Sequence, residues 1–276
     1  MKRVTIVGLG LIGGSIGRAL HQDGTIELLG VDRPELALRE DVRATFAEFV
    51  SIEEAPKRRH LLLASDMVVL CQPVHVIADT IGSYLSAHTV VTDTGSTKRL
   101  IVERAGSTEH SSWFVPGHPM AGREKGGFEN AVADLFLGRP WILCPQGRDP
   151  QAVMRVEALL ERVGAKRVTM TPEEHDASVA ITSHIPQLLS SWLQLKASER
   201  KALLAAGPAF LEMTRTAGGA ESIWRDIFAS NADQIGELAR DAALALAAIS
   251  DALLARPPKV DPVLEILRKA RNTQKG

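Results

Sequence analysis

A glycine-rich turn near the start of the chain has the spacing of a phosphate-binding turn. Gly8, Gly10 and Gly13 follow the pattern G-x-G-x-x-G, directly after a short apolar run and before a helical pattern. The first glycine permits a tight bend, the second lets the backbone approach a pyrophosphate, and the third lets the helix pack on the strand. Since the start of a helix also attracts phosphate, we expect a dinucleotide here, with Leu11 and Ile12 among its contacts. The alternative is a purely structural glycine turn.

An acidic residue at the end of the next apolar run indicates which dinucleotide is bound. Asp32 lies 19 residues after Gly13. A carboxylate at this place binds the ribose 2′-hydroxyl of NAD and repels the 2′-phosphate of NADP. Its neighbour Arg33 keeps NADP as an alternative. Gln72 and Pro73 follow a later apolar run, and we expect them to lie near the same cofactor.

Two polar loops, residues 93–98 and 117–122, follow further apolar runs and would meet at one edge of a parallel sheet. His118 is the only side chain of the second loop that titrates near neutral pH. It is therefore a candidate to accept a proton from a substrate hydroxyl while a hydride leaves. The competing interpretation is a loop histidine that caps backbone groups. Ser96, in the first loop, would by itself be interpreted as a turn or helix cap.

These residues must be positioned by alternating strands and helices. Up to about residue 171, β-branched apolar runs alternate with helical patterns, which is typical of a parallel sheet covered on both faces. Runs at 140–143 and 166–170 flank an amphipathic helical pattern over 150–163, and we expect them to extend the same sheet. The other predicted strands are 4–7, 26–31, 67–70, 90–92 and 113–115.

After residue 171 the pattern is helical throughout. Thr171, Pro172 and Glu174 mark a helix start with a capping box. We therefore expect a Rossmann-type, doubly wound, mostly parallel α/β sheet over residues 1–171. An all-α domain for substrate binding and dimerisation would follow over 172–276. Its first helix carries an apolar stripe at helical spacing, formed by Ile181, Ile185, Leu188, Trp192 and Leu195.

The overall composition excludes several classes of protein. The 32 Lys+Arg and 33 Asp+Glu give a net charge of -1, so no general attraction to nucleic acid or acidic membranes is expected. Aromatic residues make up only 4%, which argues against a surface that stacks single-stranded bases. No run is long and apolar enough to span a membrane. Cys71 and Cys144 have no metal-ligand spacing, and we expect a cytoplasmic protein without a metal.

Five motifs, taken in order, resemble one enzyme family over nearly the whole chain. They are similar to those of the prephenate/arogenate dehydrogenases of tyrosine biosynthesis, and G-H-P-M-A-G is the most specific of them. The resemblance implies that NAD oxidises the hydroxyl-bearing ring carbon of prephenate while the ring carboxylate leaves as CO2, giving 4-hydroxyphenylpyruvate. Aromatisation makes this step downhill, so no metal is needed. The motifs are G-L-G-L-I-G-G-S, D-T-G-S-T-K, P-G-H-P-M-A-G-R-E-K-G-G, T-S-H-I-P-Q and T-R-T-A-G-G-x-x-S-I-W-R-D-I.

The resemblance also implies roles for particular residues. His118 matches the catalytic histidine that accepts the hydroxyl proton, and Ser96 matches the serine that orients the hydroxyl and the histidine. Arg215 matches an arginine that binds a substrate carboxylate, and His184 matches a histidine of the substrate pocket. Glu124 matches a gating carboxylate that pairs with Arg215.

The residues alone leave other interpretations of these positions open. Arg215 stands three residues after Glu212, and a surface ion pair between them is the commoner situation. His184 lies at the margin of the apolar stripe and would then be a half-buried core histidine. Arg123 follows the G-H-P-M-A-G motif, where a cation would disfavour the ammonium group of arogenate. This position favours prephenate as the substrate.

Other functions stay open as alternatives. Arogenate or 4-amino-4-deoxyprephenate would replace prephenate in closely related enzymes. A β-hydroxyacid dehydrogenase has the same domain plan but relies on a catalytic lysine in its helical half, and the chain lacks such a motif. A non-catalytic NAD-binding sensor would keep the glycine turn alone. The chain shows neither a fused chorismate mutase nor a C-terminal ACT domain, so we expect the single-function form.

The helical half is expected to form a homodimer. The run from Ser222 to about Ala255, as one helix, would be about 50 Å long, more than a small helical domain can cover. Its alanine-rich centre is apolar on more than one face. A twofold pairing would bury this surface against its own copy. The alternative is a monomer whose helix breaks near Asn231.

Overall fold

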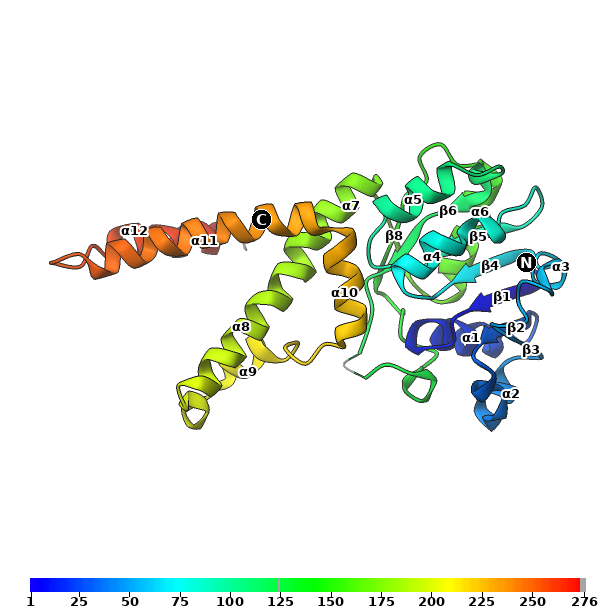
Figure 1. Cartoon of the computed structure of the whole chain (residues 1–276), viewed down its shortest axis with the longest axis horizontal. Helices are drawn as coiled ribbons and strands as arrows, with labels where there is room; N and C mark the ends of the chain where they lie inside the picture. The colour runs from blue at the N-terminus through cyan, green and yellow to red at the C-terminus, as the bar shows by residue number, and fades with distance from the viewer. Residues whose placement is uncertain (124, 274–276) are drawn as a thin grey trace. The chain divides into compact units, whose positions relative to one another are not determined.

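The computed structural model describes residues 1–123 and 125–273, and a six-stranded sheet organises its first part (Figure 1). The strand order is β3-β2-β1-β4-β5-β6, and each neighbouring pair is parallel. The order reverses between β1 and β4, and such sheets bind ligands at the carboxyl ends of the strands around this point. The predicted doubly wound sheet is confirmed. The strands are β1 (Arg3–Val7), β2 (Glu27–Asp32), β3 (Glu48–Ser51), β4 (Met67–Leu70), β5 (Val90–Asp93) and β6 (Phe114–Val115).

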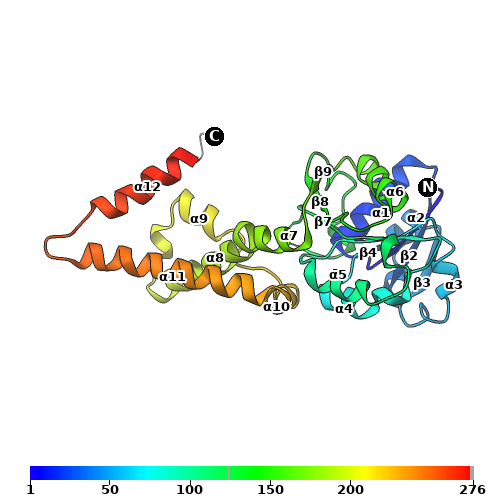
Figure 2. The ribbon, with the colours of Figure 1, turned by 90° about the horizontal axis from the view of Figure 1, so that it is seen from above.

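Helices cover both faces of this sheet (Figure 2). Successive strand residues point to opposite faces, so Ile6 belongs to a core cluster with α1 and α6, whereas Val7 belongs to a cluster with α3, α4 and α5. The helices are α1 (Leu11–Asp23), α2 (Glu40–Thr45), α3 (Arg59–Leu62), α4 (Val74–Thr80), α5 (Arg99–Gly106) and α6 (Pro150–Arg162). Short 3₁₀ turns lie at Pro34–Leu38, Ile81–Ser83, Ser111–Trp113 and Phe128–Asn130.

Three further strands form a separate sheet, β7 (Gly117–Pro119), β8 (Pro140–Leu143) and β9 (Lys166–Thr169). β7 pairs antiparallel with β8, and β8 pairs parallel with β9. The prediction that the last two strands extend the main sheet was therefore wrong. β6 ends after two residues at Pro116, which has no N–H to continue a ladder. The chain then enters the second sheet.

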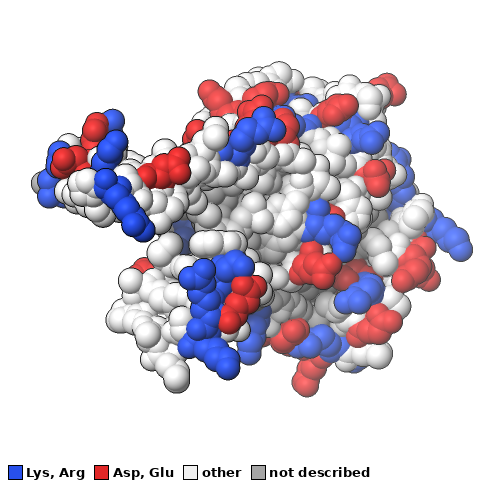
Figure 3. All heavy atoms as spheres, turned by 60° about the vertical axis from the view of Figure 1, so that its left-hand side comes forward, with Lys and Arg blue, Asp and Glu red and all other residues white. Residues whose placement is uncertain are grey.

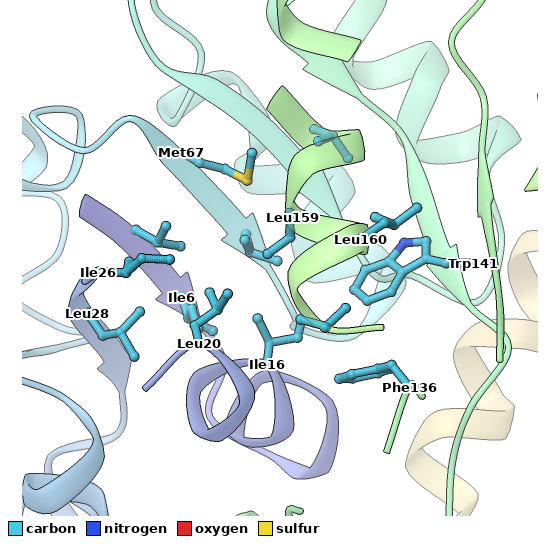
Figure 4. Packing of buried hydrophobic residues seen from close by; sticks show 14 of the residues in the cluster. Ile6, Ile16, Leu20, Ile26, Leu28, Met67, Phe136, Trp141, Leu159 and Leu160 are labelled. Carbon is cyan, nitrogen blue, oxygen red and sulfur yellow. The ribbon is translucent and has the colours of Figure 1, made fainter. Parts of the chain in front are cut away.

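One apolar cluster joins the two sheets (Figure 4). The rings of Trp141, on β8, and Phe136 lie 5.1 Å apart. They pack in the same cluster as Ile16 of α1 and Leu160 of α6, and all four side chains are buried. The second sheet is thus held by burial against helices that also cover the first.

The helices after β9 fall into two compact units. The first unit, Met1–Asn231, contains the main sheet together with α7 to α10, and the second begins at Ala232. The predicted capping box is present, because the Thr171 hydroxyl accepts from the Glu174 N–H and the Glu174 carboxylate accepts from the Thr171 N–H. The domain boundary predicted between residues 171 and 172 stays a prediction. The elements are α7 (Pro172–Val179), a π-helical turn (Ala180–His184), α8 (Ile185–Glu199), a 3₁₀ turn (Ala202–Ala205), α9 (Pro208–Thr214), α10 (Glu221–Ser230), α11 (Ala232–Leu254) and α12 (Asp261–Thr273).

The single helix predicted from Ser222 to about Ala255 is wrong, because the helix is interrupted at Asn231. This residue has φ -131° and ψ 28°, outside the helical region, and its side chain is fully buried. Its amide bonds to Arg99 and to the backbone of Asp176, and these contacts replace continued helical geometry. Within the described part of the chain, no helix has the length and apolar character needed to cross a membrane.

The cluster between the sheets should dominate the stability of the first unit. Leu159 of α6 is fully buried in this cluster, whereas Met154 of the same helix is 64% exposed. Leu159→Ala should lower the free energy of unfolding by about 2–5 kcal/mol, because it removes buried methyl groups and leaves a cavity. Met154→Ala, the matched control, should change it by less than about 0.5 kcal/mol. Urea unfolding of both variants measures this, and equal effects would contradict the assigned core.

Candidate functional site

The glycine-rich turn has the shape that a pyrophosphate requires. Gly8 has φ +93°, and a Cβ there would lie 2.8 Å from the carbonyl oxygen of Cys71. A Cβ at Gly13 would lie 1.9 Å from the carbonyl oxygen of Gly8, so the third glycine is required by the packing of α1 on the turn. No described atom lies within 4 Å of a Cβ built at Gly10, which leaves this backbone open to a ligand.

The carboxylate of Asp32 sits against this turn at the end of β2. One of its oxygens accepts a hydrogen bond from the Leu9 N–H at 2.5 Å, and the other accepts from the Arg33 N–H at 2.7 Å. The Arg33 side chain is largely exposed. Leu11 and Ile12 form the first turn of α1, directly after the glycines. These placements agree with a dinucleotide that lies across the turn and reaches the end of β2.

Gln72 adds a buried acceptor beside the same turn. It follows β4, and a Cβ at Gly8 would lie 3.2 Å from its Cγ. Its Oε1 is buried without a hydrogen-bond partner among the described residues. A buried acceptor of this kind costs free energy until a donor satisfies it. Pro73 then precedes α4. An unsatisfied acceptor next to an open glycine backbone fits a bound dinucleotide.

His118 lies in strand β7 and not in a loop as predicted. It pairs with Ile142 of β8, and the preceding Gly117 N–H donates to Oδ1 of Asp93 at 3.0 Å. Nδ1 of His118 lies 2.8 Å from Nε2 of His175, with the two rings nearly edge to face. Strand pairing on one side and an imidazole contact on the other fix the orientation of the His118 ring.

His175 and Asp176, at successive positions of α7, continue this contact into the interior. Nδ1 of His175 lies 2.7 Å from Oδ1 of Asp176, and both side chains are fully buried. The Asp176 carboxylate also accepts the N–H groups of Lys98 at 2.7 Å and of Arg99 at 3.0 Å. The Arg99 Nε–H donates to it at 3.2 Å. Helix α7 is thereby bound to the loop that follows β5.

Lys98, in the loop after β5, forms a fully buried ion pair with Asp93, the last residue of β5. Both side chains have no exposed surface. Besides the Lys98 ammonium, the Asp93 carboxylate accepts the N–H groups of Gly95 at 2.8 Å and of Gly117 at 3.0 Å. A Cβ at Gly117 would lie 2.9 Å from the Asp93 carbonyl oxygen, so only glycine fits there. This carboxylate connects the end of β5 to the strand that carries His118.

The environment keeps both imidazoles neutral. Burial holds the pKa of His118 well below its usual range, and the neighbouring His175, Lys98 and His184 lower it further. Burial also lowers the pKa of His175, although the hydrogen bond to Asp176 partly opposes this. For Asp176, burial raises the pKa, but the hydrogen bonds from His175, Arg99 and Lys98 outweigh it and leave the pKa lowered. An ionised carboxylate thus stands behind two neutral imidazoles.

His184 is buried at the end of the π-helical turn, more deeply than a half-buried core histidine. Its Nδ1 lies 3.3 Å from Nδ2 of Asn231. The same amide donates to the Asp176 carbonyl oxygen at 2.8 Å and accepts from Nη2 of Arg99 at 2.9 Å, so its orientation is set. His184 Nδ1 is therefore an acceptor. Burial lowers the pKa of His184 to about 4, so its Nε2 carries the hydrogen.

The structure does not bring all the predicted site residues together. Ser96 is partly exposed in the loop after β5, and its hydroxyl makes no hydrogen bond to any residue in 1–123 or 125–273. Arg215 is exposed at the end of α9, and Arg123 is exposed in the segment after β7. Glu124 lies outside the described residues. The roles predicted for these four residues stay predictions.

Sequence reasoning missed the buried polar residues that support His118 and His184. Among them, Lys98 stands in the D-T-G-S-T-K motif, and its total burial has no signature in a lone sequence. The His–Asp dipeptide in the first turns of α7 was the available signal, because an apolar face there would have been expected. Within the described part of the chain, no group of three His, Cys, Asp or Glu side chains is arranged to hold a metal ion. The missed residues are Lys98, Asp93, Arg99, His175, Asp176 and Asn231.

Two family models match consecutive parts of the chain. The model described as prephenate dehydrogenase, nucleotide-binding domain, matches residues 16–169. The model described as prephenate dehydrogenase, dimerization domain, matches residues 171–268. Together they cover the chain from the middle of α1 to the middle of α12.

Curated relatives and solved structures bear related names. The chain is 31% identical to the cyclohexadienyl dehydrogenase of Zymomonas mobilis, over 84% of this chain and 81% of that enzyme. It is 33% identical to the prephenate dehydrogenase of Bacillus subtilis over 84% of this chain, and it spans 65% of that enzyme. The prephenate dehydrogenase of Aquifex aeolicus, in complex with hydroxyphenyl propionate and NAD+, matches with a TM-score of 0.82 at 27% identity, covering 100% of this chain and 98% of the other. The Synechocystis arogenate dehydrogenase matches with a TM-score of 0.76 at 27% identity, covering 99% of each chain.

The three glycines of the turn should respond differently to substitution. Gly13→Ala should lower the free energy of unfolding by about 1–3 kcal/mol, because the new Cβ collides with the carbonyl group of Gly8. Gly10→Ala should leave thermal stability unchanged but weaken dinucleotide binding roughly tenfold, because a methyl group enters the space of the pyrophosphate. Thermal unfolding and fluorescence titration with NADH measure the two effects. Unchanged NADH binding by the Gly10 variant would place the pyrophosphate elsewhere.

Proposed function

The chain belongs to the prephenate dehydrogenase family, and from this premise we propose that it converts prephenate to 4-hydroxyphenylpyruvate by NAD-dependent oxidative decarboxylation. The observation that carries the proposal is the placement of His118. A neutral, ring-oriented imidazole stands where β5 and β6 end, at the same edge of the sheet as the glycine turn. This is the arrangement that removal of a hydroxyl proton beside a nicotinamide requires.

In the proposed reaction, His118 accepts the proton of the ring hydroxyl. A bound nicotinamide dinucleotide supplies the acceptor for the hydride. The C–C bond to the ring carboxylate breaks, and its electron pair completes the aromatic ring as CO2 leaves. His118 is suited to this step because burial keeps it unprotonated at neutral pH. Ser96, in the loop after β5, would orient the hydroxyl and His118.

The dianionic substrate needs local cations, because the chain has a net charge of -1. We assign one carboxylate to Arg215, whose planar guanidinium can bind it with two hydrogen bonds. Arg123 would lie near the substrate side chain, and Glu124 would gate the site by pairing with Arg215. His184 would present its Nε2–H to the substrate, since Nδ1 is occupied by Asn231.

A second candidate substrate is arogenate, because a relative and a solved structure are named cyclohexadienyl dehydrogenase and arogenate dehydrogenase. Arg123 argues for prephenate, since a cation near the side chain disfavours the ammonium group of arogenate. The test is NADH formation with prephenate, arogenate and 4-amino-4-deoxyprephenate in parallel assays. The highest kcat/KM is expected for prephenate. No turnover of any of the three would overturn the proposed function.

Asp32 should set the preference for NAD. Asp32→Ser removes the carboxylate beside the turn, so it should raise the KM for NAD and improve the relative use of NADP, with exposed Arg33 available to the 2′-phosphate. Glu35→Ser, an exposed carboxylate three residues later, is the matched control and should leave both KM values unchanged. Steady-state kinetics with each cofactor measure this. A wild-type enzyme that prefers NADP at saturating substrate would contradict it.

His118 should make activity depend on pH in a defined direction. Only the neutral imidazole accepts a proton, and its pKa lies well below the usual 6.5. The kcat/KM of the wild type should therefore stay near its maximum as pH falls through 6.5 and decline only at lower pH. His118→Asn should lower kcat by roughly 10²–10⁴ and remove this acidic limb. His88→Asn, at an exposed position, is the control. An active His118 variant with the wild-type pH profile would show that His118 is not the proton acceptor.

The protein should work as a homodimer through its helical half, and this pairing should bury the apolar stripe that runs from Ile181 in the π-helical turn along α8. In one chain Ile181, Leu188, Trp192 and Leu195 are exposed, Trp192 by 56% and Leu195 by 61%. Figure 3 turns the helical part toward the viewer and shows broad areas without charged side chains. Trp192→Glu combined with Leu195→Glu should shift sedimentation from twice 29.8 kDa to a single chain mass. Leu38→Glu, on the sheet domain, is the control. A fully active wild-type species near 30 kDa would exclude an obligate dimer.

A further inference from the structure

We propose that His175 and Asp176 are positioning residues that hold His118 in its base form and share the positive charge when it accepts a proton. The inference rests on the proposed function and adds two residues to its proton chemistry. It is carried by an unbroken chain of contacts, 2.8 Å from partly buried His118 to His175 and 2.7 Å from His175 to Asp176, the last two being fully buried.

The carboxylate of Asp176 sets the direction of this chain. Oδ1 faces His175 and the Lys98 N–H, and Oδ2 faces the N–H and the Nε–H of Arg99. An ionised carboxylate only accepts hydrogen bonds. Nδ1 of His175 must therefore be the donor, and in a neutral ring Nε2 is then left as an acceptor.

The same logic determines the tautomer of His118. Its Nδ1 faces the bare Nε2 of His175 at 2.8 Å, so Nδ1 must carry the hydrogen. In the neutral ring this leaves the lone pair on Nε2, the nitrogen that does not face His175. The ring is thus held as a base with its accepting nitrogen available to a substrate hydroxyl. An isolated histidine would divide between both tautomers.

The proton balance of the step follows from these assignments. The hydroxyl proton of the substrate passes to Nε2 of His118, and the Nδ1–H of His118 shifts toward Nε2 of His175. The Nδ1–H of His175 stays on its ring and donates to Asp176. The positive charge is then shared by two imidazoles and lies next to a carboxylate. After product leaves, the shift reverses and Nε2 of His118 releases the proton to water.

Several charged groups face the His118–His175–Asp176 contacts and affect the pKa values of the two imidazoles. Lys98, Asp93 and Arg99 approach from the loop after β5 and the start of α5, and His184 approaches from the π-helical turn. Cys144, at the end of β8, interacts with Lys98, Asp93 and Asp176, and burial raises its pKa to about 12, so it stays a neutral thiol.

Substitution of His175 tests whether an acceptor is required. His175→Phe keeps a ring but removes both nitrogens, and kcat should fall by roughly 10²–10³. His175→Gln keeps a carbonyl acceptor for His118 and an amide donor for Asp176, so it should retain kcat within about tenfold of the wild type. The matched control is Val179→Ala, at a buried position one turn later in α7. This substitution loosens the helix without touching the contacts between His118, His175 and Asp176. Equal kcat for the Phe variant and the wild type would overturn the proposal.

Substitution of Asp176 tests charge sharing through the pH profile. Asp176→Asn removes the carboxylate that stabilises the protonated imidazoles, so the acidic limb of kcat/KM should move to lower pH while kcat falls. The control Val179→Ala should not move the limb. A limb at the wild-type position in a folded Asp176 variant would overturn charge sharing. If this variant does not fold, the proposal is tested by the two His175 variants and by the tautomer measurement described next.

The tautomer of His118 can be measured independently of enzyme activity. In protein labelled with ¹⁵N-histidine, long-range ¹H–¹⁵N spectra identify the protonated nitrogen of His118, assigned through the His118→Asn variant. We expect a hydrogen on Nδ1 and none on Nε2 in the wild type and in His175→Gln. A hydrogen on Nε2 of the wild type would overturn the inference even if the enzyme were active. Failure to oxidise any substrate, with the expected tautomer present, would overturn only the proposed function.

Discussion

A fully buried carboxylate, Asp93, and a fully buried ammonium, Lys98, determine how the candidate site is assembled. Two charges removed from water are tolerated only when they are paired and their remaining hydrogen-bonding groups are satisfied. Asp93 meets this condition with the N–H of Gly95 and the N–H of Gly117, which opens the second sheet. The backbone of Lys98 meets Asp176 of α7. One ion pair therefore ties the main sheet to both segments that carry the adjacent imidazoles.

The site combines strong charges with neutral bases, and this combination depends on local pairing. Asp93 has Lys98 as its partner, and Asp176 has Arg99. Burial is the largest influence on the pKa of both His118 and His175, and Asp176 only partly opposes it at His175. A site with an uncompensated carboxylate would favour imidazolium and lose its base. A site with an uncompensated cation would reduce the proton affinity of the base.

The main sheet, the glycine turn and the Thr171 cap were all predictable, because each depends on residues close in the chain. Periodicity reports that the runs at 140–143 and 166–170 are buried strands, but it does not report their partners. Their place in a second sheet depends on Pro116 ending β6. The interruption at Asn231 was equally hidden, since its cause is a side-chain bond to Arg99, 132 positions away. His175 was overlooked for the same reason: its importance comes from a contact with His118 that no local pattern encodes.

The π-helical turn Ala180–His184 contains one residue more than an α-helical turn would need. Each residue of an α-helix advances the direction of the side chains by roughly 100°, so this extra residue sets the rotational phase of all of α8. Gln187 and Ser190, which are buried, and Leu188 and Trp192, which are exposed, owe their directions to the same insertion. Deleting one residue from this turn would rotate both faces together. The buried polar face and the apolar outer surface of α8 therefore depend on the same turn, because a change in its length moves both at once.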